Sequence, residues 1–111
     1  MFGLKKKQDN ETLKNSVIAQ LRTVFDPEIP VNIYDLGLIY DIAINDDRQV
    51  HLQMTLTTPG CPVAQTFPGT VEQAVNQLEW VNDCTVELVW DPPWSQERMT
   101  EAARLELGIF Y

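Results

Sequence analysis

The chain of 111 residues is poor in the side chains that bind metals or form disulfides, with only two cysteines and one histidine. A disulfide scaffold needs several paired cysteines, and a domain of this length buries roughly two-thirds of its unfolded surface without them. A closed zinc or iron–sulfur site uses about four ligands, often cysteines. Because the sequence has no CxxC and no HxxxH pattern, one chain cannot supply an all-cysteine cluster site. A metal bound through one of these thiols must take further ligands from a second copy, another protein, a small thiol or carboxylates.

Long hydrophobic runs are also missing. No apolar stretch approaches the ~20 residues that cross a bilayer. The lysines at positions 5–7 are not followed by the apolar stretch of a secretory signal. We therefore expect a cytoplasmic protein with no membrane partner, whose thiols stay reduced.

Positive charge is scarce. Eight basic residues face sixteen acidic ones, a net charge of −8. Three of the lysines lie in the first seven residues, so the rest of the chain holds five basic and sixteen acidic residues, a net charge of −11. A body this acidic repels phosphate backbones, which argues against nucleic-acid binding and leaves proteins or cationic ligands as partners.

Hydrophobic periodicity predicts six elements. Helical spacing recurs from a cap at Asp9 or Asn10 to Val24, and again over 63–78 and 97–107, while apolar and polar residues alternate over 38–45, 50–57 and 84–90. The order α-β-β-α-β-α predicts an α+β fold with two layers, in which helices pack on a small mixed sheet. We expect a flexible N-terminal tail over 1–8 and a single domain over 9–111. Strand order does not follow from the pattern.

The strand segments predict which side chains face the core. The alternation places Leu38, Tyr40, Ile42 and Ile44 on one face of the first strand. It places Thr55 and Thr57 on the polar face of the second, which pairs with the first as a hairpin. In the third strand, Cys84, Val86, Leu88 and Trp90 share a face.

Proline, glycine and serine mark the helix boundaries. Pro68 and Gly69 predict either a kink in the second helix or a start near Gly69. Ser95 is expected to cap the last helix, over Glu97–Leu107, and Gly108 to end it. Gly37 is expected to permit a tight turn before the first strand.

The two cysteines occur in different settings. Cys84 lies in an apolar strand and is expected to be a small buried hydrophobe. Cys61 lies in "TTPGCP", with Thr57, Thr58, Gly60 and Pro62 as the supporting loop, directly before a predicted helix. A helix N-terminus lowers a thiol pKa from about 8.5 toward neutrality and favours the thiolate, which is the nucleophilic and metal-binding form. Cys61 is therefore the candidate functional thiol, and the alternative is a cysteine merely tolerated in a loop.

Catalysis by Cys61 lacks a credible base. His51, the one histidine, projects from the polar face of the second strand and is expected to be a solvated surface residue. Ten residues along the chain separate it from Cys61, so a Cys–His dyad depends entirely on the fold. No glycine-rich phosphate loop is present, and we do not expect an enzyme.

Three acids lie in the segment "DPEIPVNIYDLG". Asp26, Glu28 and Asp35 could contact a cation or orient a partner. The alternative is that Asp26 and Asp35 accept backbone hydrogen bonds in turns. In "WDPPW", Trp90 and Trp94 either close the core or present an aromatic patch.

Three motifs occur together: "DPEIPVNIYDLGLIY", "MTLTTPGCP" and "VELVWDPPW…MTEAARLELG". In this combination the chain resembles the metal–sulfur cluster biosynthetic proteins of the SufT and PaaD-like group, over about residues 17–110. The stretch "CPVAQTFPGTVEQAV" is more similar to SufT. The resemblance implies a small domain of helices and strands that assists maturation or delivery of iron–sulfur clusters. It places the family's motif cysteine on Cys61 and its acidic motif on Asp26 and Glu28.

The leading hypothesis is a non-enzymatic accessory factor for iron–sulfur cluster maturation that delivers clusters to client proteins through Cys61. We expect no stably bound cofactor, only transient contact of Cys61 with iron or a cluster. The expected partners are iron–sulfur assembly or carrier proteins and client apoproteins, and a homodimer would double the Cys61 ligands. Two alternatives stay open: a scaffolding adaptor in a multiprotein complex, as in PaaD-like oxygenase maturation, and, third, a thiol enzyme.

Overall fold

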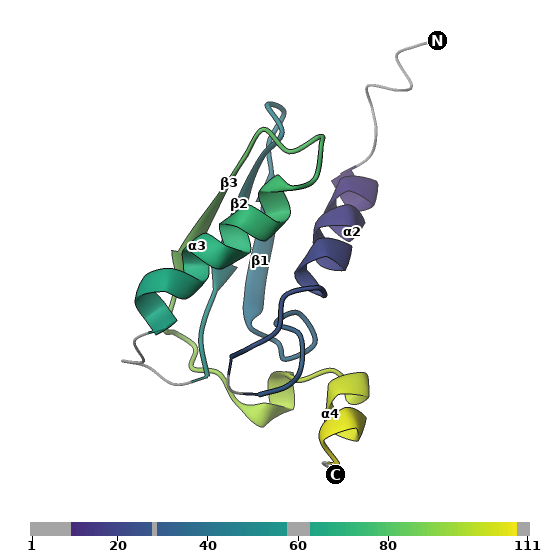
Figure 1. Cartoon of the computed structure of the whole chain (residues 1–111), viewed down its shortest axis with the longest axis vertical. Coiled ribbons are helices and arrows are strands. Elements are labelled where there is room, and N and C mark those ends of the chain that lie inside the picture. Colours follow the sequence, from purple (N-terminus) through teal and green to yellow (C-terminus); the bar gives the residue numbers. More distant parts are fainter. Residues whose placement is uncertain (1–9, 28, 58–62, 109–111) are drawn as a thin grey trace.

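The predicted α+β class and the order α-β-β-α-β-α are confirmed in a computed structural model that describes residues 10–27, 29–57 and 63–108 (Figure 1). The chain forms, in order, α2 (Asn10–Leu21), β1 (Ile39–Ile44), β2 (Gln49–Met54), α3 (Val63–Asn76), β3 (Asp83–Leu88), the 3₁₀ turn η1 (Gln96–Arg98) and α4 (Glu101–Leu107). No helix in these described ranges has the length and apolar character to span a membrane.

The three strands form one mixed sheet in the order β1-β2-β3. β1 and β2 are an antiparallel hairpin, whereas β2 and β3 run parallel. A parallel pair needs a crossover connection, which α3 supplies. The hairpin and the mixed sheet were predicted, and the strand order is what the structure adds.

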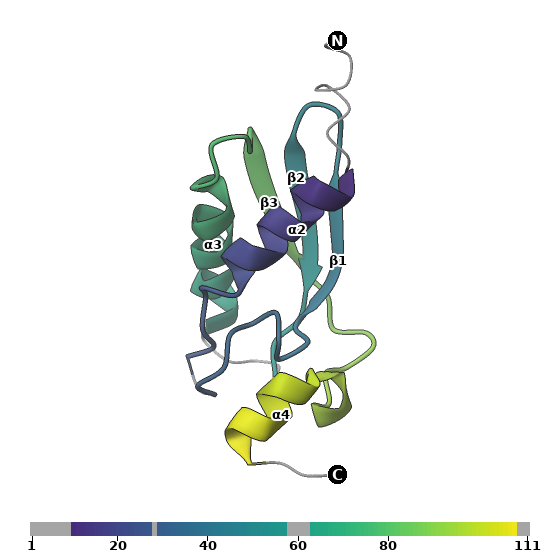
Figure 2. The same ribbon diagram turned by 90° about the vertical axis from the view of Figure 1, so that its right-hand side faces the viewer.

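The helices α2 and α3 cover one face of the sheet, α2 across β1 and α3 along β3 (Figure 2). The core lies between these layers and is almost fully buried; its centre is formed by Val17, Leu21, Val50, Leu52, Met54, Val71 and Val75. The opposite face carries exposed or half-exposed side chains, among them Asp41, His51 and Glu87. This one-sided burial explains the alternation in the strand segments.

The predicted inner face of β1 is wrong at Tyr40. The register shifts between Ile39 and Asp41, so Ile39 pairs with Met54 although Ile42 pairs with Leu52. This β-bulge places Ile39, Ile42 and Ile44 against the core instead of a strict alternation from residue 38.

The third strand ends earlier than predicted. β3 stops at Leu88, and Trp90 is 41% exposed rather than part of the inner face. Trp90 lies beyond the last strand residue, next to Asp91–Pro92, whose peptide bond is cis. Trp94, in contrast, packs against the core, and its indole N–H donates to the carbonyl of Leu36 at 2.7 Å.

The start of α3 contradicts one of the two predictions for this helix, a start near Gly69. α3 is helical from Val63 through Pro68 to Asn76, so the helix does not start near Gly69. The buried stripe of Phe67, Val71 and Val75 outweighs the missing N–H of one proline.

The last helix is shorter than predicted. Ser95 precedes the 3₁₀ turn without capping it through its side chain, and α4 starts at Glu101. The cap is Thr100, whose hydroxyl accepts the N–H of Ala103 at 3.2 Å. Met99, which is buried, lies between the 3₁₀ turn and Thr100. Gly108 ends α4 with φ 75°, as predicted.

Several chain segments converge at one end of the sheet. Because β1 is antiparallel to β2 and β3 is parallel to it, the start of β1 lies beside the ends of β2 and β3. The crossover helix α3 begins at this end, where the segment 22–38 and the C-terminal segment also lie (Figure 1). Of the predicted site residues that the structure describes, Asp26 and Asp35 belong to the segment before β1, and Thr57 follows the end of β2.

Candidate functional site

Five of the predicted site residues, Cys61, Thr58, Gly60, Pro62 and Glu28, lie outside the described residues. The structure describes what flanks the first four in the chain: Thr57, half-buried beyond the end of β2, and Val63, the first residue of α3. Cys61 therefore precedes the first helical residue by two positions.

The start of α3 has no acidic residue in its first turn. The unpaired N–H groups of a first helical turn carry roughly half a positive charge. An acid there would neutralise part of this charge. Its absence leaves the positive end of α3 to act on groups that precede the helix.

Thr55 is buried, which corrects the prediction that it lies on the polar face of β2. It is 1% exposed, and its N–H donates to the carbonyl of Leu38 at 2.9 Å, beyond the last residue of β2. Its hydroxyl oxygen is fully buried and has no hydrogen-bond partner among the described residues. Such a group costs about 1–3 kcal/mol relative to a satisfied one. It lies where the chain leaves the sheet toward Cys61.

Asp26 is 9% exposed, so its carboxylate faces the protein rather than solvent. Its Oδ2 accepts the N–H of Ile29 at 2.8 Å, and its own N–H donates to the carbonyl of Val31 at 3.1 Å. These bonds close the turn at "DPEIP", as expected of an aspartate in a turn.

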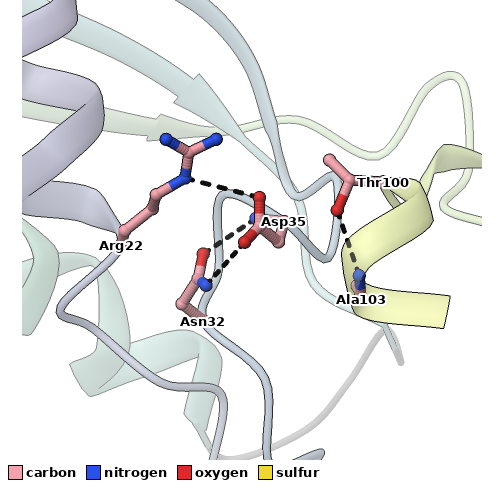
Figure 3. Close-up of polar contacts among 5 residues, drawn as sticks. All are labelled: Arg22, Asn32, Asp35, Thr100 and Ala103. Atoms are coloured by element: carbon pink, nitrogen blue, oxygen red, sulfur yellow. Dashed lines mark hydrogen bonds and ion pairs between the residues drawn. The ribbon is translucent and has the colours of Figure 1, made fainter. Parts of the chain in front are cut away.

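Asp35 is the centre of a polar network that joins three parts of the chain (Figure 3). Its Oδ1 lies 3.4 Å from Nε of Arg22, beyond the end of α2, and its Oδ2 accepts the side-chain amide of Asn32 at 2.9 Å. Its N–H donates to Oδ1 of Asn32 at 2.8 Å, and its carbonyl accepts the N–H of Thr100 at 2.9 Å. The side chain of Asp35 is 17% exposed. Its carboxylate holds the loop against α2, and its backbone carbonyl holds it to the C-terminal segment.

The C-terminal segment contacts the start of β1 through Arg98 and Pro92. The guanidinium of Arg98 lies over the ring of Tyr40, 4.5 Å from its centroid, and the hydroxyl of Tyr40 donates to the carbonyl of Pro92 at 2.8 Å. Gly37 adopts φ 82°, and a Cβ there would overlap the carbonyl of Arg98. A cleft of about 390 Å³ is lined by Gly37, Ile39, Tyr40, Pro92 and Arg98.

The sequence interpretation missed the residues that brace this end: Arg22, Asn32, Arg98 and Thr100. One of them had a readable signal, because Asn32 and Asp35 have the three-residue spacing at which an Asx side chain accepts a later backbone N–H. Arg22, Arg98 and the backbone N–H of Thr100 act through contacts between segments more than ten residues apart, for which the sequence has no local pattern.

The other candidate ligands do not form a metal site. Among the described residues, no group of three or more histidine, cysteine or acidic side chains could hold a metal ion. Cys84 is buried as predicted, and burial raises the pKa of its thiol to about 12, with Glu72 and Asp83 adding to the shift. His51 is on the open face of the sheet, where its Nε2 lies 3.1 Å from Oε1 of Glu87.

Comparison with known proteins gives consistent results. Residues 14–88 match the family described as iron-sulfur cluster assembly protein. The Fe-S protein maturation auxiliary factor YitW of Bacillus subtilis is 41% identical over 89% of this chain and 97% of its own length. The Fe-S protein maturation auxiliary factor SufT of Staphylococcus aureus is 34% identical over 78% of this chain and 98% of its own.

A solved structure has the same fold. The crystal structure of a domain of unknown function, DUF59, from Bacillus anthracis superimposes with a TM-score of 0.83 at 39% identity, covering 90% of this chain and 95% of that one. The resemblance predicted from the three motifs is thereby confirmed, including the SufT group. The names of these relatives describe auxiliary factors rather than enzymes.

Proposed function

The chain belongs to the iron–sulfur cluster assembly protein family, and from this membership we propose that it is a non-enzymatic accessory factor that assists cluster delivery to client proteins through Cys61. The cluster or iron is cargo, held transiently between this chain and an assembly, carrier or client protein. A reducing compartment such as the cytoplasm suits this role, because both thiols must stay free.

The observation that carries the proposal is the position of Cys61 relative to α3. The residue stands two positions before a helix whose first turn contains no acid. A thiolate before such a helix is stabilised by the N-terminal partial charge, which increases the fraction of the metal-binding form near neutral pH.

The second thiol supports the same assignment. Cys84 is 4% exposed, and its pKa is raised to about 12, so it is neither accessible nor ionised at neutral pH. A thiol function in this chain therefore falls to Cys61.

The acids of the loop provide little for a metal. Asp26 is buried and holds a turn, and Asp35 is engaged by Arg22 and Asn32. We therefore propose that the remaining ligands of a transferred cluster come from the partner molecule. Glu28, or a second copy of Cys61 in a homodimer, is the further candidate within this protein.

The test replaces Cys61 with serine in the full chain and measures aconitase activity in cells that lack the natural protein. We expect the variant to fold and to lose most of its support of aconitase maturation. Cys84→Ala is the matched control, since it removes the other thiol and should leave maturation intact. Full maturation by Cys61→Ser would contradict the role of the thiol.

A chemical test separates the two cysteines directly. Iodoacetamide should alkylate Cys61 in the native protein near pH 7, whereas Cys84 should react only after denaturation. Mass spectrometry of the intact protein and of its peptides distinguishes the two sites. Equal reactivity of both thiols in the native state would contradict the assignment.

An adaptor role that does not use the thiol is the alternative, and the exposure of Trp90 favours it. Trp90 is 41% exposed beyond the end of β3, and tryptophans are enriched among the residues that dominate binding at protein interfaces. In that case Trp90→Ala would reduce complex formation with an assembly or client protein, while Cys61→Ser would have no effect.

A further inference from the structure

The sheet has two edges, and one of them is closed by a side chain. Along a strand, the backbone N–H groups of successive residues point alternately toward and away from the neighbouring strand. Val89, directly after β3, donates its N–H to the carbonyl of Met54 in β2. The N–H of Val86, three residues earlier, therefore points away from β2. Oε2 of Glu72 in α3 accepts this N–H at 2.9 Å. The middle of the β3 edge is therefore blocked to another strand.

Among the described residues, no side chain protects the edge of β1 in this way. Asn45 donates its N–H to the carbonyl of Gln49, which sets the alternation of the antiparallel ladder. The backbone groups of Ile42 and Ile44 consequently point away from β2. Within the described residues, no hydrogen bond from β1 reaches any group on this side.

The open part of the edge is short and has clear limits. At one end the bulge at Tyr40 interrupts the ladder, and the hydroxyl of Tyr40 donates a hydrogen bond to the carbonyl of Pro92. At the other end the hairpin turn starts at Asn45. Residues 41–44 are left as a template for one short extended segment.

The side chains beside this edge determine which segment fits. On the inner face, Ile42 and Ile44 are half-buried and pack beside α2. On the outer face, Asp41 is exposed, and Asp46 and Asp47 are exposed in the adjoining turn. A strand added here would place alternate side chains against apolar and against acidic neighbours.

We infer that the β1 edge over residues 41–44 binds an extended segment of a partner protein by strand addition, and that this segment alternates apolar residues with lysine or arginine. Backbone hydrogen bonds to Ile42 and Ile44 pair the partner segment with β1. The carboxylates of Asp41 and of the adjoining turn attract positively charged side chains of that segment. The inference does not depend on Cys61, because the residues that carry it belong to β1 and the hairpin.

The test titrates the ¹⁵N-labelled full chain with the peptide acetyl-Val-Lys-Val-Lys-Val-amide. We expect chemical-shift changes and slower hydrogen exchange at the amides of Ile42 and Ile44. A glutamate version of the peptide should bind roughly tenfold more weakly, because each opposite-charge pair across strands is replaced by a repulsive one. A version with alternate amides N-methylated should not bind, because it lacks the hydrogen-bond donors.

Two variants localise the effect. Asp41→Lys should reverse the preference between the lysine and glutamate peptides. Asp83→Lys, an exposed acid at the edge of β3, is the matched control and should leave the preference unchanged.

Three results would overturn the inference. The first is equal binding of the N-methylated peptide, and the second is a response centred on β3. The third is protection of the Ile42 and Ile44 amides from hydrogen exchange without peptide. Protection that does not change with protein concentration would show that the chain itself covers this edge. Protection that increases with concentration would assign the edge to a second copy.

Discussion

Substitution of Gly37 by alanine tests whether the C-terminal segment is packed as tightly on the loop as the structure indicates. The φ of Gly37 is 82°, which costs an alanine about 1–2 kcal/mol. The new Cβ would also overlap the carbonyl oxygen of Arg98 and lie 2.7 Å from its carbonyl carbon. These are backbone atoms and cannot rotate away, so overpacking adds about 1–3 kcal/mol.

Gly37→Ala is therefore expected to lower the unfolding free energy by about 2–5 kcal/mol. For a domain of this size each kcal/mol corresponds to about 4–8 °C in Tm, so the decrease should be at least about 8 °C. Urea unfolding followed by circular dichroism measures the free energy, and a thermal scan measures Tm.

Two other glycines separate the contributions. Gly108 has φ 75°, and an added Cβ would meet no atom within 4 Å, so Gly108→Ala should show only the backbone cost of about 1–2 kcal/mol. Gly69 is inside α3 in open space, so Gly69→Ala should stabilise by about 0.5–1 kcal/mol. If Gly37→Ala and Gly108→Ala lose the same free energy, the close approach of Arg98 is refuted.

Three further predictions concern groups with defined partners. Burial and nearby acids raise the pKa of Cys84 from 9.0 to about 12, so the thiol loses its proton at lower pH in the unfolded chain than in the folded one. The unfolding free energy should therefore fall as pH rises from about 9 toward 12. Urea titrations should show a smaller decrease over this pH range for Cys84→Ala. Glu72→Ala should cost about 1–2 kcal/mol and speed the hydrogen exchange of the Val86 amide, whereas Glu72→Gln, which keeps an acceptor, should cost less; equal exchange in both variants would contradict the bond. Asp35→Ala should cost about 1–3 kcal/mol by urea unfolding, and Arg22→Ala, which removes only a half-exposed partner, less than about 1 kcal/mol; the reverse order would contradict the network.

The element order and most of the core follow from local patterns. The helical stripe through Leu13, Val17 and Leu21 and the alternation through Val50, Leu52 and Met54 predict elements and faces that the structure confirms. These predictions succeed because each element must bury one face, and the side-chain period of a helix or strand is a property of its own backbone.

The family could also be predicted, because the three motifs keep their residues close together along the chain. The position of Cys61 before a helix follows from the same local pattern, and the helix starts at Val63. Its assignment as the functional thiol is still a proposal that the Cys61→Ser experiment decides.

The tertiary structure decided where residues distant in the chain meet. The bulge at Tyr40, the burial of Thr55 and the exposure of Trp90 all depart from the local pattern at the end of the sheet where segments converge. A local sequence pattern does not report contacts with residues that are tens of positions away. At this end of the sheet such contacts override the local pattern. The same holds for the strand order, and thus for the difference between the closed β3 edge and the open β1 edge. The sequence by itself determined which faces must be buried, and only packing in three dimensions determined which backbone groups of the described residues pair with one another.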